Sequence, residues 1–178
     1  MRQLILGGAR SGKSRLAEER ALAWAGREGA ERIYLATARV GDEEMARRVN
    51  VHRQRRDANW LLLEEPEDLA GAIARLKHRR ACVLIDCLTL WISNCLHAGN
   101  WETQRDRLLE QVALLEAERS PLELILVSNE VGSGIVPLGA LSREFVDASG
   151  WLHQVLARHC ETVTLVVAGL PLALKQPQ

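Results

Sequence analysis

The residues best suited to chemistry lie near the start of the chain, where Gly7 to Ser14 read GGARSGKS and fit G-x-x-x-x-G-K-[ST] at every position. Glycines in such a loop let successive backbone N–H groups point at a polyphosphate. Lys13 can reach the β- and γ-phosphates, and the Ser14 hydroxyl can ligate Mg²⁺. An apolar strand, Leu4 to Leu6, precedes the loop, and a helical stretch, Arg15 to Arg27, presents its positive end to the same anion. We therefore expect the chain to bind a nucleoside triphosphate, the alternative being a chance glycine-rich turn.

A second candidate is Asp86, which ends the apolar run Val83-Leu84-Ile85. A hydrophobic strand followed by a carboxylate is the Walker B pattern, in which the carboxylate holds Mg²⁺ directly or through water beside the P-loop serine. The pattern is weak alone, because any buried strand can be followed by Asp at a turn. Together with the complete P-loop upstream it favours a metal role for Ser14 and Asp86.

The segment from Met45 to Trp60 carries five arginines around a single histidine, His52. A guanidinium cluster suits bidentate phosphate binding, and a neutral imidazole among such donors can attack phosphorus. A solvated basic helix face with an incidental histidine is the more common explanation of such a pattern. The residue pattern alone leaves these two interpretations open.

A polar, glycine-containing stretch, Ser128 to Pro137 (SNEVGSGIVP), follows a predicted strand. A loop at this point would lie at the same sheet edge as the P-loop and Asp86, where a substrate loop is expected. A simple turn between strand and helix is the other interpretation.

Strand-like apolar runs alternate with helical stretches along the chain, and these elements must position the candidate residues. The predicted strands are 4–6, 32–36, 60–63, 81–85, 122–127 and 163–168, and the predicted helices are 15–27, 42–56, 66–77, 88–98, 101–118 and 138–159. Pro66 is taken as a first-turn proline. Repeated β-α units with continuous apolar strands predict an α/β fold, a mostly parallel sheet flanked by helices, in a single domain spanning 1–178.

Composition is that of a compact enzyme of the cytoplasm. The 178 residues carry 23 basic and 23 acidic side chains, so no overall field attracts nucleic acid or an anionic membrane. We expect no membrane span and no signal peptide, because the chain has no sufficiently long apolar run and begins directly with strand and P-loop. The four cysteines have no C-x-x-C spacing and are expected to be reduced packing residues.

Taken together, these segments resemble the bifunctional adenosylcobinamide kinase / adenosylcobinamide-phosphate guanylyltransferase family of cobalamin biosynthesis. The resemblance spans the chain in order. Its stretches are GGARSGKS at 7–14, YLATA at 34–38, His52, Arg56 and Trp60, LIDCLTLW-x-x-N at 84–94, VSNEVGSGIVP at 127–137 and LSREFVDASG at 141–150. The sequence departs from the family pattern at Asp57, often Pro, at His153, often Asn, and at Asp86, which is Glu in some relatives.

The resemblance implies a RecA-like P-loop fold and two reactions. A nucleoside triphosphate, ATP or GTP with Mg²⁺, would phosphorylate adenosylcobinamide. GTP would then guanylylate His52, and GMP would pass to adenosylcobinamide phosphate. Lys13 joins His52 as a catalytic residue. The implied nucleotide contacts are Gly7, Gly8, Ala9, Arg10, Ser11, Gly12, Lys13, Ser14, Ala36, Thr37, Ala38, Arg53, Gln54, Arg55, Arg56, Glu64 and Asp86.

Two rival hypotheses are a single-function P-loop kinase of another metabolite, with His52 incidental, and a nucleotide-binding switch that acts through partners. Labelling by α-labelled GTP separates the first rival from the bifunctional enzyme. The second would need an interaction surface or a basic stripe, of which the neutral composition gives no sign. Some relatives are trimers, so the resemblance also implies a homo-oligomer.

Overall fold

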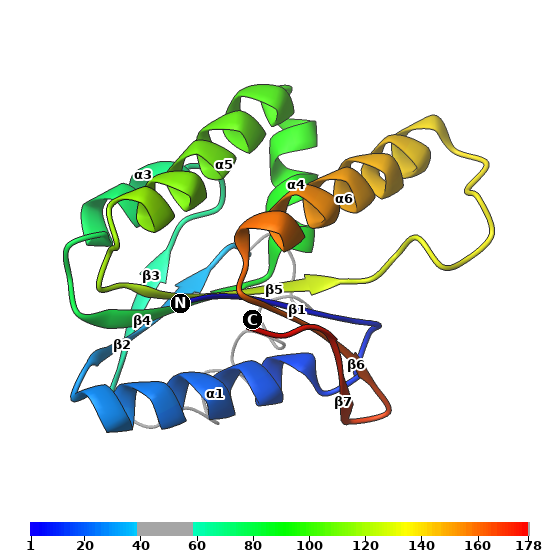
Figure 1. The fold of residues 1–178 in the computed structure, drawn as a ribbon. Coiled ribbons are helices and arrows are strands. Elements are labelled where there is room, and N and C mark those ends of the chain that lie inside the picture. The colour runs from blue at the N-terminus through cyan, green and yellow to red at the C-terminus, as the bar shows by residue number, and fades with distance from the viewer. Residues whose placement is uncertain (39–58, 178) are drawn as a thin grey trace.

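A sheet of seven strands runs through the part of the chain that the computed structural model describes, residues 1–38 and 59–177 (Figure 1). Its strand order is β3-β2-β4-β5-β1-β6-β7, and every neighbouring pair is parallel except β6 and β7. The elements are β1 (Arg2–Gly7), α1 (Lys13–Glu28), β2 (Glu31–Ala36), β3 (Trp60–Glu64), α3 (Leu69–Leu76), β4 (Ala81–Asp86), α4 (Leu88–His97), α5 (Trp101–Ala117), β5 (Glu123–Asn129), α6 (Ala140–His159), β6 (Thr162–Val167) and β7 (Leu170–Lys175). The predicted α/β fold with a mostly parallel sheet is confirmed.

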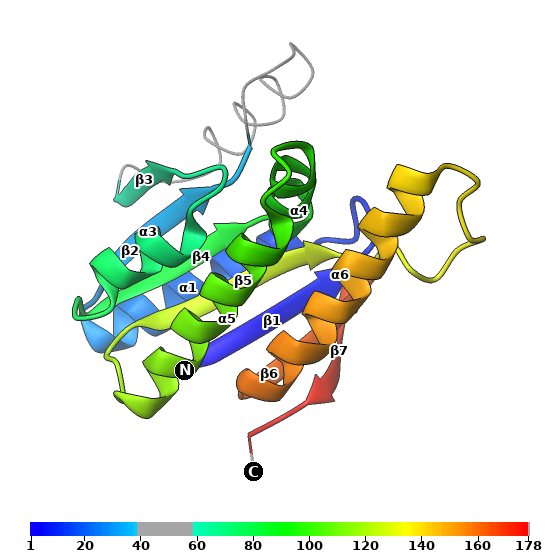
Figure 2. The same ribbon diagram turned by 90° about the horizontal axis from the view of Figure 1, so that it is seen from above.

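Helices cover both faces of the sheet. In Figures 1 and 2, α1 lies on one face, whereas α3, α4, α5 and α6 lie on the other. The central strands are therefore buried on both sides, which explains their continuous apolar runs. All six residues of β1 and the first five of β4 are buried. Within the described residues, no helix combines the length and the apolar character needed to cross a membrane.

Helix α1 packs closely on the sheet through small side chains. Ala17, Ala21 and Ala25 recur every four residues, so they share one helix face, and all three are buried. Ala17 and Ala21 belong to a buried cluster that includes Ile5 and Leu84 of the sheet. The larger cluster on the other face surrounds the fully buried Trp91. This packing fixes the start of α1, and hence the P-loop, against the end of β1.

Within the described residues, the structure differs from the predicted elements at two places, and the predicted helix 42–56 lies outside those residues. The helix expected to start with Pro66 begins only at Leu69, because the Asp68 side chain accepts a hydrogen bond from the Gly71 N–H at 3.1 Å and caps the helix. Strand β7 was not predicted. It is an exposed antiparallel edge strand, and the proline within it, Pro171, is tolerated only at such an edge.

Candidate active site

The P-loop joins β1 to α1 and takes a conformation that glycine makes possible. Gly12, the residue before α1, has φ 98°, a left-handed conformation that favours glycine. At Gly7 the constraint is space, since an added Cβ would lie 2.5 Å from Ser11 Oγ and 2.6 Å from the Val166 carbonyl oxygen. Together these two glycines let the loop curl tightly, so that backbone N–H groups and the N-terminus of α1 can face an anion.

Lys13 is buried within this loop. Its Nζ donates a hydrogen bond to the Gly8 carbonyl oxygen at 3.0 Å, and the residue is only 8% exposed. Burial lowers the pKa of the Lys13 ammonium, and the negative charge of nearby Asp86 acts in the opposite direction. A cation partly stripped of water, with a neutral carbonyl as its hydrogen-bond partner, is well placed to exchange that partner for a phosphate oxygen.

Two segments distant in sequence support the P-loop from outside. The Gly169 N–H, in the turn between β6 and β7, donates to the Ser11 carbonyl oxygen at 2.8 Å, and the Glu130 N–H donates to the Gly7 carbonyl oxygen at 3.1 Å. Sequence reasoning missed Gly169, and the Ala168-Gly169 dipeptide before alternating leucines was the available hairpin signal. Both residues have positive φ, 53° and 80°, as a tight hairpin turn requires.

Asp86 ends β4 at the same sheet edge. Only β5 separates β4 from β1, so two strand spacings of about 4.8 Å put Asp86 roughly 10 Å from the end of β1. The neighbouring Cys87 is not a nucleophile, because burial first, and Asp86 next, raise the pKa of its thiol to about 11. All four cysteines are free thiols, as expected.

The residues at 14 and 86 fit a magnesium ion by the chemistry of their donors. Ser14 offers a hydroxyl and Asp86 a partly buried carboxylate, the oxygen ligands that Mg²⁺ prefers. Among the described residues, no cluster of three or more His, Cys, Asp or Glu side chains could hold a metal. Mg²⁺ takes one or two protein oxygens and completes its shell with phosphates and water.

The predicted contacts at 36–38 and 64 lie farther along the same edge. Thr37 is buried and structural: its Oγ1 donates to the Cys87 carbonyl oxygen at 2.7 Å and accepts from the Cys87 N–H at 3.0 Å. Asn94 Nδ2 donates to the Thr37 carbonyl oxygen at 2.8 Å. Glu64 is exposed at the end of β3, four strand spacings, or about 19 Å, from β1. Asp86 and Thr37 thus lie between the P-loop and Glu64.

The stretch after β5 is anchored by a buried polar group that sequence reasoning had left without a role. His153 Nε2 of α6 lies 2.7 Å from Ser128 Oγ, which lies 3.3 Å from Thr89 Oγ1. Thr89 Oγ1 accepts the Asn129 N–H at 2.8 Å. Burial lowers the pKa of the His153 imidazole, and the charge of Glu130 partly opposes this. The departure from the family's Asn at 153 was the signal in the sequence.

His52, Arg53, Gln54, Arg55 and Arg56 lie outside the described residues. The chain leaves the described part at Ala38, just after β2, and enters it again at Asn59, just before β3. The structure therefore brings together the P-loop, Asp86 and the start of the loop after β5, and leaves the predicted role of the arginine segment as a prediction.

A glycine-dependent P-loop between strand and helix, with a carboxylate two strands away at the same edge of a parallel sheet, defines a P-loop nucleotide-binding enzyme. The fold is similar to that of a KaiC-like protein from the archaeon Pyrococcus horikoshii, with a TM-score of 0.52 and 16% sequence identity. The match covers 92% of this chain and 69% of that chain. This similarity shows that the fold is RecA-like, and it carries no information about activity or substrate.

The chain belongs to the cobinamide kinase / cobinamide phosphate guanyltransferase family, whose model matches residues 3–174. It is 51% identical over 178 residues to the bifunctional adenosylcobalamin biosynthesis protein CobP of Pseudomonas aeruginosa, covering 98% of each chain. It is 36% identical over 183 residues to the bifunctional adenosylcobalamin biosynthesis protein CobU of Escherichia coli, covering 97% of this chain and 98% of the relative. The resemblance is confirmed, and the protein is a transferase of this bifunctional family.

Proposed function

We propose that this chain first phosphorylates the aminopropanol hydroxyl of adenosylcobinamide and then transfers GMP from GTP to the product, through a covalent intermediate on His52. The observation that carries the proposal is a single P-loop with a buried lysine, Lys13, in a chain that matches the family along residues 3–174. Adenosyl-GDP-cobinamide is the product of the two reactions.

In the first reaction the substrate hydroxyl oxygen attacks the γ-phosphorus of ATP or GTP, and the bond to the β,γ-bridging oxygen breaks to release the diphosphate. Such a transfer needs mainly positioning and neutralisation of charge, which the P-loop N–H groups and Lys13 supply. The proton of the hydroxyl needs an acceptor. Glu130 is our candidate, because its N–H is anchored on the P-loop at Gly7 and its carboxylate is not required for the metal.

In the second reaction a ring nitrogen of His52 attacks the α-phosphorus of GTP, and pyrophosphate leaves. A phosphate oxygen of cobinamide phosphate then attacks the phosphorus of the His52–GMP adduct, the P–N bond breaks, and the imidazole is restored. A covalent intermediate divides one difficult displacement into two in-line steps. Arg53, Arg55 and Arg56 would neutralise the triphosphate and the departing pyrophosphate.

Mg²⁺, held by Ser14 and Asp86, would supply electrostatic stabilisation of the phosphate oxygens. Lys13 would interact with the same phosphate oxygens, because Lys13 and Asp86 are close enough for their charges to interact. Asp86→Asn would raise the Mg²⁺ concentration that gives half-maximal turnover. An unchanged Mg²⁺ dependence in that variant would remove Asp86 from the metal site.

The test is to incubate the protein with adenosylcobinamide, Mg²⁺ and ATP or GTP and to follow both products by chromatography. We expect adenosylcobinamide phosphate with one equivalent of nucleoside diphosphate, and adenosyl-GDP-cobinamide when GTP is present. Lys13→Ala should abolish both products with the circular dichroism unchanged, because both reactions use one P-loop. Lys175→Ala, at the opposite edge of the sheet, is the control. Near wild-type turnover by Lys13→Ala would contradict the proposal.

A further inference from the structure

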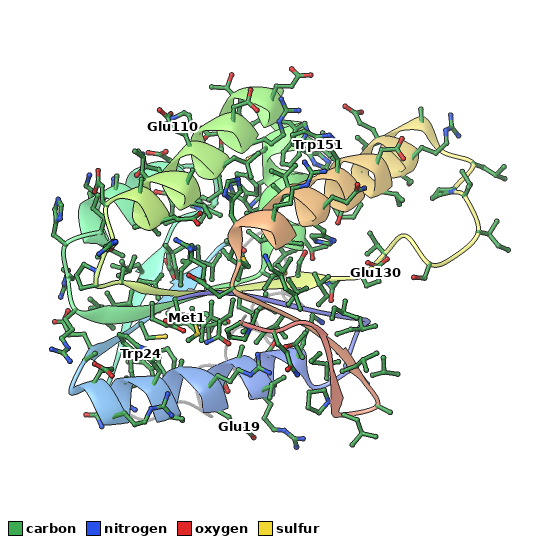
Figure 3. All side chains as sticks on the ribbon, in the orientation of Figure 1. Met1, Glu19, Trp24, Glu110, Glu130 and Trp151 are labelled. Atoms are coloured by element: carbon green, nitrogen blue, oxygen red, sulfur yellow. The ribbon has the colours of Figure 1, made fainter. Side chains whose placement is uncertain are left out.

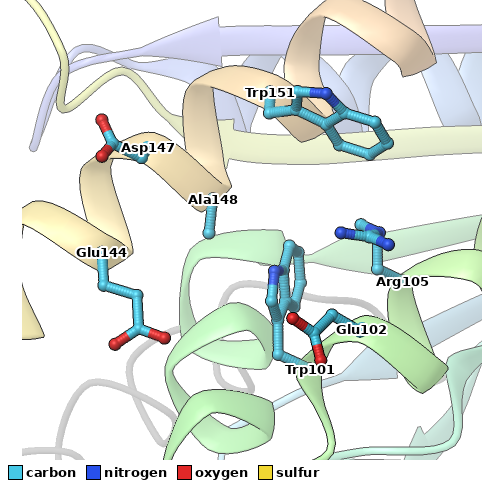
Figure 4. Close-up of a pocket in the computed structure, with 7 residues that line it drawn as sticks. All are labelled: Trp101, Glu102, Arg105, Glu144, Asp147, Ala148 and Trp151. Atoms are coloured by element: carbon cyan, nitrogen blue, oxygen red, sulfur yellow. The ribbon is translucent and has the colours of Figure 1, made fainter.

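An open hollow of about 530 Å³ lies between α5 and α6 on the helical layer (Figure 4). It is lined by Trp101, Glu102 and Arg105 from α5 and by Glu144, Asp147 and Trp151 from α6. None of these side chains has a role in the nucleotide site described above.

Two indole rings form walls of the hollow. Trp101 is held by the buried Trp91, whose ring meets it edge to face at a centroid distance of 5.5 Å. Trp151 is 47% exposed, and the Arg105 guanidinium carbon lies 4.7 Å from the centroid of its ring. Figure 4 shows the two rings on different sides of the opening. A flat ligand would find a fixed aromatic wall on one side and an exposed indole on the other.

The charge of the hollow is negative. Arg105 is already neutralised, because its Nε donates to Asp106 at 2.8 Å. The carboxylates of Glu102, Glu144 and Asp147 form no ion pair with other residues of the described part. Exposed aromatic faces beside unpaired carboxylates attract a cation and donors of hydrogen bonds, and they repel phosphate.

The hollow lies one helix away from the nucleotide site. His153 of α6 faces inward and lies 2.7 Å from Ser128 at the end of β5. Trp151, only two residues earlier in α6, faces outward, since each residue of a helix turns about 100°. About one helix diameter, roughly 10 Å, therefore separates the hollow from the carboxyl end of β5.

We propose that this hollow holds the corrin macrocycle of cobinamide during phosphoryl transfer, an inference that rests on the proposed function. The macrocycle is flat, carries primary amides around its rim, and is cationic when adenosyl and water are its axial ligands. These properties match the indole faces and the carboxylates. The reacting hydroxyl lies at the end of a flexible aminopropanol side chain. The corrin ring therefore needs a binding site that is separated from the P-loop by about the length of this side chain.

Binding of two corrinoid probes that differ in charge tests the proposal without catalysis. Aquocyanocobinamide carries one positive charge and dicyanocobinamide is neutral, and equilibrium dialysis read by corrin absorbance gives the Kd of each. The Glu144→Gln/Asp147→Asn double variant should bind the cationic probe about tenfold more weakly and the neutral probe within about twofold of wild type. Glu110→Gln, an exposed carboxylate of α5 outside the hollow, is the matched control and should change neither Kd (Figure 3).

Trp151→Ala tests the aromatic wall. It should raise the Kd of both probes and the KM for adenosylcobinamide about tenfold, with the KM for GTP unchanged.

The proposal would be overturned if both variants bound the two probes with unaltered Kd values. If those variants also had an altered oligomeric mass, the hollow would be a contact between subunits. Failure of wild type to bind either probe would also overturn it. If the wild-type protein bound cobinamide but did not phosphorylate it, only the proposed function would be contradicted. If the variants were active and their KM for adenosylcobinamide were unchanged, only this inference would be contradicted.

Discussion

The side chains of His153, Ser128 and Thr89 form a hydrogen-bonded series next to the end of β1, because Ser128 pairs with Leu6. The series ends at the backbone of Asn129, whose N–H donates to Thr89 Oγ1. His153 is 7% exposed, and burial lowers the pKa of its imidazole below the ordinary value of 6.5. The ring is therefore mostly neutral near pH 7 and can share one hydrogen bond with Ser128 Oγ. Its role is that of a positioning residue, since it acts through Ser128 and Thr89.

This lowered pKa makes the stability of the fold depend on pH. Below pH 6.5 the unfolded chain takes up a proton on this imidazole before the folded chain does, so the free energy of unfolding falls as the pH falls through the lowered folded pKa. We expect His153→Asn, which cannot titrate, to lose less stability than wild type between about pH 7.5 and about pH 5.5 in urea unfolding. His78→Asn, at an exposed histidine, is the control. Equal losses in wild type and His153→Asn would contradict the assignment.

At the scale of the elements, the junction of β1, the P-loop and β6 is the tightest point around the site. A Cβ at Gly7 would lie too close to Ser11 Oγ and to the Val166 carbonyl oxygen, and the latter is backbone that cannot move aside cheaply. Gly7→Ala should therefore cost about 1–3 kcal/mol in the free energy of unfolding and weaken GTP binding. At Gly8 an added Cβ meets nothing within 4 Å, so Gly8→Ala should change stability by less than about 0.5 kcal/mol. Chemical denaturation of the two variants checks the contrast, and equal costs would refute it.

The buried strands were predictable from the sequence, because a strand covered on both faces must be apolar along its length. The predicted run 81–85 matches β4, and 122–127 matches β5 within two residues. The P-loop was predictable for a different reason, since its geometry depends on residues adjacent in sequence. Strand β7 was missed because Pro171 interrupts a short alternation of leucines, and its pairing partner β6 became known only from the structure.

The rest of the site depends on contacts between residues far apart in the chain. His153 and Ser128 are 25 residues apart, and Gly169 reaches Ser11 from the far end of the chain. No local pattern encodes such pairs, because they arise only when the order of strands in the sheet is known. The family resemblance implies a catalytic role for His52 and nucleotide contacts at Thr37 and Glu64, and none of these side chains carries a motif of its own.

At the scale of the whole molecule, apolar side chains remain exposed beside the site. Ile135 and Leu138, in the loop between β5 and α6, are each 98% exposed, and Leu170 of β7 is 72% exposed. Ile135 and Leu138 lie in one short segment, and exposed apolar residues that lie close together commonly mark a contact surface. We propose that the chain forms a homo-oligomer. Light scattering after gel filtration should give a multiple of the 19.8 kDa chain mass, and three copies is the value that the resemblance implies. A monomer would contradict this proposal.

In the proposed mechanism one P-loop serves both reactions, and only the guanylyl transfer requires His52. Wild-type protein incubated with α-labelled GTP should retain a covalent label that is stable to alkali and labile to acid, as expected for a phosphoramidate. His52→Ala should carry no label and make no adenosyl-GDP-cobinamide, yet it should still convert adenosylcobinamide to its phosphate, because that step requires the P-loop and not this imidazole. His78→Ala should label normally. Normal labelling of His52→Ala would contradict the claim.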